Sequence, residues 1–264
     1  MKHQARKRFG QNFLVDEAVI ASIIAAIRPA AGEHLVEIGP GLGALTRPLL
    51  AAAGTLHAIE IDRDLAQSLQ RDYGAHLTLH AADVLQFDFA TLGDGLRVIG
   101  NLPYYISTPL LFYLVDYADR IRDIHVMLQK EVVERMVAAP GDSNYGRLSV
   151  MLQYRFEMEK LLDVPATAFE PVPKVDSAVI RLTPLRPRPY VARDEAQLAR
   201  VVTAAFSQRR KTLRNSLRKY ITEPDFNALN IAPTARAQEL SVGQFVALAD
   251  CLGSSAQTTD GAAG

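Results

Sequence analysis

The chain has 264 residues, enough for two domains or for one large domain with an appendage. Hydrophobic residues make up 48% and charged residues 22%, which excludes a wholly disordered chain, a collagen-like fibre and a disulfide-stapled miniprotein. The 29 basic residues balance the 29 acidic ones, so the net charge indicates no partner. The charge is sorted along the chain, however. Residues 1–184 carry 18 basic and 22 acidic residues (net −4), and residues 185–250 carry 11 and 6 (net +5).

The chain shows no sign of disulfides, bound metal or membrane spans. Its single cysteine, Cys251, excludes an intramolecular disulfide and argues against a thiolate metal site. His76 and His80 flank a predicted strand, so we expect surface or core residues rather than ligands, and no metal is predicted. The apolar run at 19–27 is too short to cross a bilayer of ~30 Å. We therefore expect a cytoplasmic protein with no membrane anchor.

The first two thirds of the chain alternate between apolar runs and helical periodicity. Asp16 is expected to cap a helix that ends near Pro29. The following pattern is typical of βαβ units around a parallel sheet covered on both faces. Residues 145–156 fit a helix or a strand, and we favour the helix. Strands are expected over 34–38, 55–61, 77–81, 96–100 and 124–128, helices over 44–53, 63–71, 109–118 and 131–139, and a closing pair of strands over 161–165 and 177–182.

A proline-rich segment, Pro184–Pro189, predicts the domain boundary, because proline lacks the backbone N–H and has a fixed φ. Residues 1–184 are expected to form the first domain and residues 185–252 a small helical one, with helices over 194–207, 211–220 and 241–252. Residues 253–264 are small and polar and are predicted to be disordered. The predicted fold is α/β: a Rossmann-like domain with a mainly parallel sheet and an antiparallel edge hairpin, then a small all-helical domain.

A glycine-rich turn, Glu37–Gly43, joins the first predicted strand of the sheet to its helix. Gly39 and Gly41 allow the backbone to bend sharply and approach a ligand. Glu37 is badly placed to meet a pyrophosphate but suits a cation. Glu60 ends the next strand, where it can accept both ribose hydroxyls, and Asp83 ends the third, where it can accept from an adenine amine.

Taken together, these carboxylates predict a pocket for a cationic nucleoside without phosphate, namely S-adenosylmethionine. The alternative is a tight βα turn without a ligand and solvated acidic residues at the strand ends.

The tetrapeptide Asn101–Tyr104 follows the fourth predicted strand at the same edge. The N6 amine of adenine is a poor nucleophile, because its lone pair is delocalised into the ring. The Asn101 side-chain oxygen and a backbone carbonyl, of Leu102 or Pro103, can accept both N6 hydrogens and direct the lone pair at a methyl group. Tyr104 offers a flat face for a flipped base. Alone, the same residues also suit an ordinary turn.

Two basic clusters are candidates for nucleic-acid contact, although either could be a solvated charged face. On a helix over 211–220, Lys211, Arg214 and Arg218 would share one face and could follow phosphates. The predicted RNA-binding residues are Arg6, Lys7, Arg8, Arg209, Arg210, Lys211, Arg214 and Arg218.

The ordered motifs resemble the ribosomal RNA adenine N6-dimethyltransferases, and in detail the bacterial small-subunit, KsgA-type dimethyladenosine transferases. The resemblance covers nearly the whole chain, from about residue 4 to about residue 252. The motifs that carry it are Gln11–Leu14, Glu37–Gly43, Glu60, Asp83, Asn101–Tyr104, Asn144–Ser149, Phe169–Ser177 and Phe206–Asn215.

This resemblance implies roles for individual residues. Asn12 and Leu14 would close over the methionine end of the donor, and Gly39 would approach its backbone. Asn101 and Tyr104 would receive the target base, and Phe169 would stack on its other face. The implied substrate is a pair of adjacent adenines near the 3′ end of 16S rRNA, in an immature 30S subunit. We expect the protein to act as a monomer.

Three alternatives remain. The nearest is a 23S rRNA adenine dimethyltransferase of the macrolide-resistance type, which shares the stretch Phe169–Ser177 and the basic helical domain. The runs Tyr145–Ser149 and Arg209–Asn215 favour the small-subunit type. A non-catalytic ribosome-assembly factor could keep the fold, although the complete set of acidic residues and Asn101 argues for catalysis. A DNA adenine methyltransferase is disfavoured, because 264 residues leave no room for a target-recognition domain.

Overall fold

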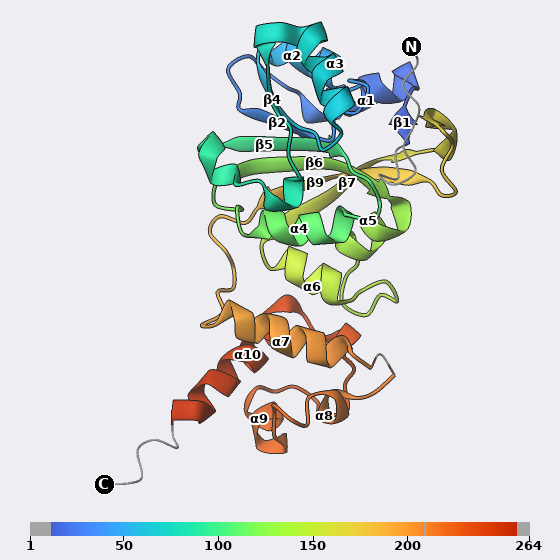
Figure 1. The fold of residues 1–264 in the computed structure, drawn as a ribbon. Helices are drawn as coiled ribbons and strands as arrows, with labels where there is room; N and C mark the ends of the chain where they lie inside the picture. The colour runs from blue at the N-terminus through green and yellow to red at the C-terminus, as the bar shows by residue number, and fades with distance from the viewer. Residues whose placement is uncertain (1–11, 209, 258–264) are drawn as a thin grey trace. The chain divides into compact units, whose positions relative to one another are not determined.

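The structure is a computed structural model that describes residues 12–208 and 210–257 (Figure 1). The chain forms two compact units. The first holds the residues up to Val133 together with Glu157–Pro184, and the second holds Glu134–Phe156 together with the residues from Leu185 onward. The segment 134–156, which was expected in the first domain, thus packs with the second unit. The physical reason is burial: Tyr145, Val150 and Tyr154 lie in the apolar core of that unit.

The first unit is built on a seven-stranded sheet with the order β4-β3-β2-β5-β6-β9-β7. The five strands from β4 to β6 are parallel, and β9 runs antiparallel to β6. These outcomes confirm the predicted mainly parallel sheet. Its strands are β2 (Leu35–Ile38), β3 (Leu56–Ile59), β4 (Leu77–His80), β5 (Leu96–Asn101), β6 (Ile121–Gln129), β7 (Phe156–Val164) and β9 (Ser177–Pro184).

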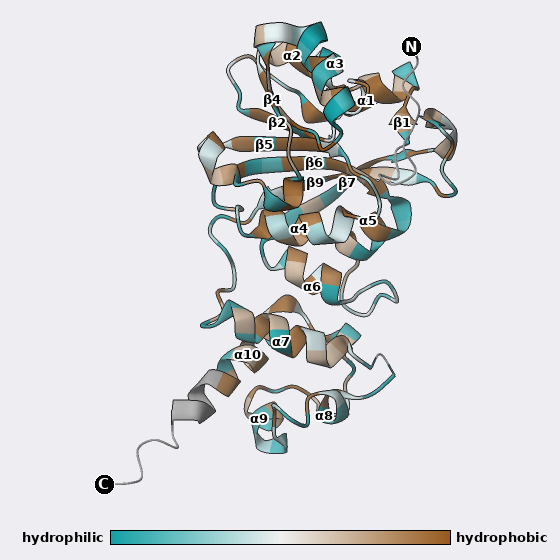
Figure 2. Cartoon of the chain, viewed as in Figure 1, coloured by the Kyte–Doolittle hydropathy of each residue, from teal (hydrophilic) through white to brown (hydrophobic). Residues whose placement is uncertain are grey.

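The strand order reverses between β2 and β5. From β2 the chain passes outward to β3 and β4, then returns to place β5 on the other side of β2. The carboxyl ends of β2 and β5 therefore flank the topological switch point, where open parallel sheets bind ligands. All four residues of β2 and the first five of β5 are buried, and β5 is coloured largely hydrophobic in Figure 2.

Helices α1 (Glu17–Ile27), α2 (Thr46–Ala53), α3 (Arg63–Tyr73) and α4 (Ser107–Val115) belong to the first unit, and α5 (Lys130–Val137) spans the boundary between the units. Asp16 caps α1 as predicted, because its carboxylate accepts the N–H groups of Ala18 and Val19 at 2.9 and 3.0 Å. No helix in the described part of the chain is long and apolar enough to span a membrane.

A second, two-stranded sheet was not predicted from the sequence. Strand β1 (Phe13–Leu14) pairs antiparallel with β8 (Phe169–Glu170), so that Leu14 lies opposite Phe169. Strands of two residues are too short to carry a hydrophobic period, so no local pattern could reveal them. This pairing brings the N-terminal segment to the sheet edge that carries the glycine turn.

The second unit is helical, with α6 (Arg147–Gln153), α7 (Glu195–Phe206), α8 (Leu213–Ser216), α9 (Glu223–Ala228) and α10 (Val242–Gln257). The favoured helix within 145–156 is thus present as α6. Helix α10 continues to Gln257, five residues into the segment that was predicted to be disordered. The remainder of that segment lies outside the described residues.

The predicted helix over 211–220 is wrong in length, because α8 covers only Leu213–Ser216. Asn215 and Ser216 are weak helix formers, and the Ser216 hydroxyl donates back to the Leu213 carbonyl. Leu217, which follows α8, is buried in the core of the unit. Lys211 and Arg218 therefore lie outside the helix, and the shared helical face predicted for Lys211, Arg214 and Arg218 does not exist.

Candidate active site

A cavity of about 310 Å³ opens at the carboxyl ends of β2, β3 and β5, within the first unit. It is large enough for a small organic ligand. All residues predicted to bind a cofactor or to catalyse line it: Asn12, Leu14, Glu37, Gly39, Gly41, Glu60, Asp83, Asn101, Leu102, Pro103, Tyr104 and Phe169. The structure thus brings together side chains that lie up to 157 positions apart in the sequence.

The glycine turn is tied to the carboxylate of Glu60. The Gly41 N–H donates to Glu60 Oε2 at 3.2 Å, and the Asp62 N–H donates to Oε1 at 2.9 Å. Gly41 has a φ of 60°, and an added Cβ would lie 3.3 Å from the Phe13 ring. Glycine is needed there both for the backbone conformation and for the close approach of Phe13. Burial raises the pKa of Glu60, which is 5% exposed.

Glu37 is the most enclosed acidic residue of the cavity. It is 2% exposed, and its Oε2 accepts the hydroxyl of Thr46, the first residue of α2, at 2.6 Å. Burial and, less strongly, the nearby Glu60 carboxylate raise the pKa of Glu37 to about 8, although the Thr46 hydrogen bond opposes them. A cationic ligand beside this group would favour its ionised form.

Asp83 lies at the third strand end, directly before a short 3₁₀ turn over Val84–Gln86. Its Oδ1 accepts the Leu85 N–H at 3.0 Å, and its Oδ2 accepts the Gln86 side-chain amide at 3.4 Å. These bonds orient the carboxylate. Each oxygen retains a lone pair, so the group can still accept a hydrogen bond from a ligand amine.

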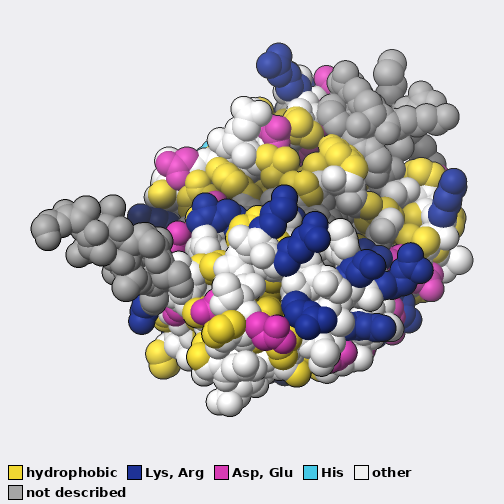
Figure 3. All heavy atoms as spheres, turned by 90° about the horizontal axis from the view of Figure 1, so that it is seen from below, with side chains coloured by type: hydrophobic (Ala, Val, Ile, Leu, Met, Phe, Trp, Pro, Cys, Tyr) yellow, Lys and Arg dark blue, Asp and Glu magenta, His cyan; other side chains and the backbone are white. Residues whose placement is uncertain are grey.

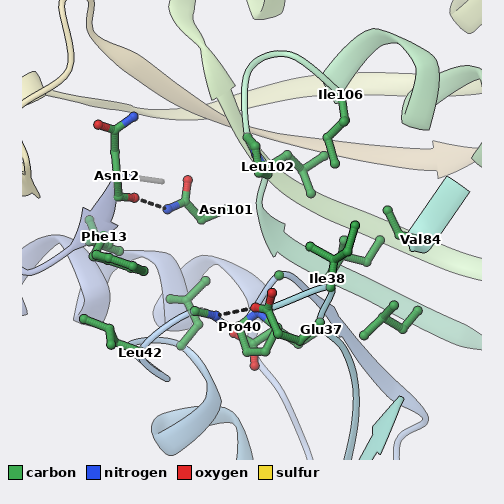
Figure 4. A pocket seen from close by; sticks show the side chains of 18 of the residues that line it. Asn12, Phe13, Glu37, Ile38, Pro40, Leu42, Val84, Asn101, Leu102 and Ile106 are labelled. Carbon is green, nitrogen blue, oxygen red and sulfur yellow. Dashed lines mark hydrogen bonds between the residues drawn. The ribbon is translucent and has the colours of Figure 1, made fainter. Parts of the chain in front are cut away.

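Asn101 ends β5, and its side-chain amide has a defined orientation. Its Nδ2 donates to the backbone carbonyl of Asn12 at 3.2 Å, as the dashed line in Figure 4 shows. With the amino group engaged, the Oδ1 of Asn101 is the end of the amide left to accept hydrogen bonds. The preceding residue must be glycine, because a Cβ on Gly100 would lie 2.7 Å from the Ile38 carbonyl oxygen.

The two candidate backbone acceptors after Asn101 differ. The Pro103 carbonyl already accepts the Ser107 hydroxyl and the Ile106 N–H, both at 3.1 Å. Leu102 donates its own N–H to the Met127 carbonyl at 3.2 Å, while its carbonyl accepts no hydrogen bond from the described residues. Of the two, the Leu102 carbonyl is therefore the acceptor available to a ligand.

Two aromatic residues border the acceptor side of the cavity. The Tyr104 hydroxyl lies 2.9 Å from the Ser177 hydroxyl, which fixes the ring between β5 and β9. Phe169 is only 3% exposed and belongs to the apolar core with Leu14, so a limited part of its ring reaches the cavity. Stacking of Phe169 on a base stays a prediction.

Several lining residues were not predicted. Tyr105, Leu42 and Ile61 line the cavity with 56, 53 and 45% of their surfaces exposed. The pKa of Tyr105 is raised by burial and by the Asp83 and Glu60 carboxylates, which places it on the side of these acids. The sequence offered one signal for these residues, their position beside predicted site residues. Leu42 lies within the glycine turn, Ile61 follows Glu60 and Tyr105 follows Tyr104.

The predicted RNA-binding residues fall into two groups. Arg210, Lys211, Arg214 and Arg218 are exposed in the second unit, and Arg214 lies 3.7 Å from the Glu223 carboxylate. Figure 3 shows Lys and Arg side chains gathered on the face of the molecule that it views. The other predicted residues, Arg6, Lys7, Arg8 and Arg209, lie outside the described residues.

Two of the histidines, His57 and His80, stack on each other. His57 Nδ1 lies 3.2 Å from His80 Nε2, with the rings stacked, and His76 Nδ1 lies 3.1 Å from the Gly54 carbonyl. Among the described residues, no three His, Cys, Asp or Glu side chains gather as a metal site would require.

The fold resembles two solved methyltransferase structures. A dimethyladenosine transferase from Plasmodium falciparum superposes with a TM-score of 0.77 at 25% identity, over 89% of this chain and 95% of that one. The 23S rRNA methyltransferase ErmE superposes with a TM-score of 0.71 at 28% identity, over 92% of this chain and 100% of that one. Together with the cavity at the switch point, these similarities define a Rossmann-like methyltransferase.

Comparison of sequences narrows the class. The family described as Ribosomal RNA adenine dimethylase matches residues 2–253. The Ribosomal RNA small subunit methyltransferase A of Thiobacillus denitrificans is 60% identical over 247 residues, 93% of this chain and 97% of that protein. Its namesake from Aromatoleum aromaticum is 60% identical over 248 residues, 94% of each. The chain belongs to the ribosomal RNA adenine dimethylase family, as the motifs predicted.

Proposed function

We propose that this protein transfers methyl groups from S-adenosylmethionine to N6 of two adjacent adenines in the 3′-terminal hairpin loop of 16S rRNA, giving N6,N6-dimethyladenosines. The observation that carries the proposal is the hydrogen bond from Asn101 Nδ2 to the Asn12 carbonyl. It leaves the Asn101 oxygen to accept hydrogen bonds at a cavity that Leu102 and three carboxylates also line.

The donor side of the cavity suits S-adenosylmethionine, which supplies an electrophilic methyl group when bound. Glu60 is held by two backbone N–H groups and can accept the ribose hydroxyls. Asp83 can accept from the adenine amine, and Glu37 offers a negative charge to a cation. Gly39 and Gly41 let the backbone approach closely, while Asn12 and Leu14 cover the methionine end.

The acceptor side prepares the nucleophile. The Asn101 Oδ1 and the Leu102 carbonyl accept the two N6 hydrogens of the target adenine, so that its lone pair points toward the methyl group. Pro103 restricts the loop, and its carbonyl is used to begin α4 rather than to bind substrate. Alkylation makes N6 cationic and strongly acidic, so the proton leaves without a strong base.

The target base must leave its stack to enter the cavity. Unstacking costs a few kcal/mol. Stacking on Tyr104, whose ring the Ser177 contact fixes, and on the accessible part of Phe169 offsets it by about 1–3 kcal/mol per ring face. The exposed Arg210, Lys211, Arg214 and Arg218 can add phosphate contacts, as can Arg6, Lys7, Arg8 and Arg209.

The small-subunit assignment is favoured over the 23S type. The relatives at about 60% identity carry the name Ribosomal RNA small subunit methyltransferase A, whereas the 23S enzyme is 28% identical. We further propose that the partner is an immature 30S subunit and that the protein acts in the cytoplasm as a monomer. Its single cysteine suits a reducing compartment.

The direct test incubates the purified protein with labelled S-adenosylmethionine and, separately, undermethylated 30S and 50S subunits. We expect two dimethyladenosines per 16S rRNA and no label in 23S rRNA, measured by nucleoside analysis. Label confined to 23S rRNA would overturn the proposed substrate.

A further inference from the structure

A buried hydroxyl lies directly behind the donor side of the cavity. Thr46 is fully buried and does not line the cavity, but its Oγ1 donates to Glu37 Oε2 at 2.6 Å. This distance is at the short end for a hydrogen bond between oxygens. Because Thr46 begins α2 and Glu37 lies near the carboxyl end of β2, the bond ties the helix to the strand end that borders the cavity.

Within residues 12–208 and 210–257, the groups that shift the pKa of Glu37 include no positive charge. The charged group facing it is the Glu60 carboxylate at the end of β3, which opposes ionisation of Glu37. The Glu37 charge helps to raise the pKa of Tyr73 on α3, whereas the neighbouring Arg47 lowers it. Burial and Glu60 therefore favour the neutral acid, and the Thr46 hydrogen bond opposes them.

We propose that Thr46 is a positioning residue that holds the Glu37 carboxylate toward the cavity, and that Glu37 releases a proton to solvent when the cationic methyl donor binds. The inference rests on the proposed function, because it requires a donor that carries a sulfonium and an ammonium group. The step is a simple acid dissociation: the Glu37 O–H bond breaks, the proton goes to buffer and the carboxylate stays beside the cation.

The direction of the pH effect follows from the free protein. With a pKa of about 8, Glu37 is mostly protonated at pH 7. If the donor binds the carboxylate, the dissociation constant decreases as the pH rises toward 8 and levels off above it. Between pH 6 and pH 8 the decrease should be about tenfold or more.

The test is calorimetry of donor binding at pH 7 in buffers of different ionisation enthalpy. We expect the wild-type protein to release most of one proton per donor bound beyond any proton exchange seen with Glu37→Gln. The Glu37→Gln protein also subtracts any proton exchanged by the donor's own amino group. Repeating the titration with the demethylated product, which keeps the ammonium group but lacks the sulfonium charge, shows which cation causes the proton release. Proton release with both ligands indicates the ammonium group, and proton release with the donor alone indicates the sulfonium group.

Two substitutions of Thr46 separate positioning from general packing. Thr46→Val keeps the shape but removes the hydrogen-bond donor, so the pH at which affinity levels off should rise. Thr46→Ser keeps the hydroxyl and should retain the wild-type pH profile. A thermal melt of each variant confirms that it is folded.

Each result bears on a separate claim. Donor binding without proton release contradicts the proposed titration of Glu37 and leaves the methyltransferase proposal intact. Equal pH profiles for Thr46→Val and Thr46→Ser contradict the positioning role. A folded wild-type protein that binds neither donor nor product contradicts the proposed function itself.

Discussion

The cavity edge of the sheet and the basic segment 210–219 were both recognised from charged or polar residues, yet the structure treats them differently. At the cavity, Glu37, Glu60, Asp83 and Asn101 each make a hydrogen bond that sets their orientation. In the basic segment, Arg210, Lys211 and Arg218 are exposed side chains beside a helix of four residues. Ligand binding at the cavity should therefore depend on the exact orientation of each side chain, whereas binding at the basic segment should depend mainly on the number of positive charges.

The difference has an electrostatic cause. A hydrogen bond in a buried site acts at low effective dielectric, and it orients its groups in the folded protein before the ligand binds. An exposed cation is screened by water and salt, so its exact position matters less. Single substitutions should accordingly have large effects at the cavity and small ones in the basic segment.

The largest effect is expected from Asn101→Ala. This change removes the side-chain oxygen that accepts an N6 hydrogen and also the hydrogen bond to the Asn12 carbonyl. We expect kcat for methylation of undermethylated 30S subunits to fall by about 100-fold or more. Particle binding, measured by cosedimentation, should be unchanged. A variant that methylates at the normal rate would contradict the role given to Asn101.

An intermediate effect is expected from Gly100→Ala, because the new Cβ would lie 2.7 Å from the Ile38 carbonyl oxygen. Relieving this contact must separate β2 from β5 beneath the cavity. We expect the free energy of unfolding to fall by about 1–3 kcal/mol in urea titration. Gly146→Ala is the matched control. Gly146 has an extended φ of −163°, and the nearest atom to an added Cβ is the Asn144 carbonyl oxygen at 4.0 Å. Stability should therefore change by less than about 0.5 kcal/mol.

The smallest effect is expected in the basic segment, from Arg218→Ala compared with Arg214→Ala. Arg214 lies 3.7 Å from Glu223, and both side chains are about 60% exposed, so part of its charge is already offset. Arg218→Ala should weaken rRNA binding several-fold and lower the salt dependence by about one phosphate contact. Arg214→Ala should do less. Equal salt slopes for both variants and the wild type would exclude phosphate contact here.

The predictable part of the site consists of residues whose function depends on strand ends. Strands show as apolar runs, and parallel strands place their carboxyl ends at one edge, so Glu60, Asp83 and Asn101 could be assigned to one pocket. Thr46 and Gly100 could not, since the role of each depends on an atom supplied by β2. The choice of Leu102 over Pro103 as acceptor likewise required the contacts with Ile106 and Ser107.

The errors have a common origin in the competition between local periodicity and packing. Helical spacing over 211–220 was real, but the weak helix formers Asn215 and Ser216 stand where α8 ends. The segment 134–156 follows the first domain in the chain, but its apolar side chains complete the core of the second unit. The packing of segment 134–156 with the second unit is not encoded within a window of a few residues.

The sequence by itself determined the alternation of strands and helices, the order of the motifs and hence the family, because hydrophobic period and residue chemistry are local properties. Tertiary structure decided which groups meet: β1 with β8, Thr46 with Glu37, and Asn12 with Asn101. These contacts join residues that are distant in the chain or lie on different elements. Their geometry is set by close packing and by the need to satisfy buried polar groups, which only the folded chain resolves.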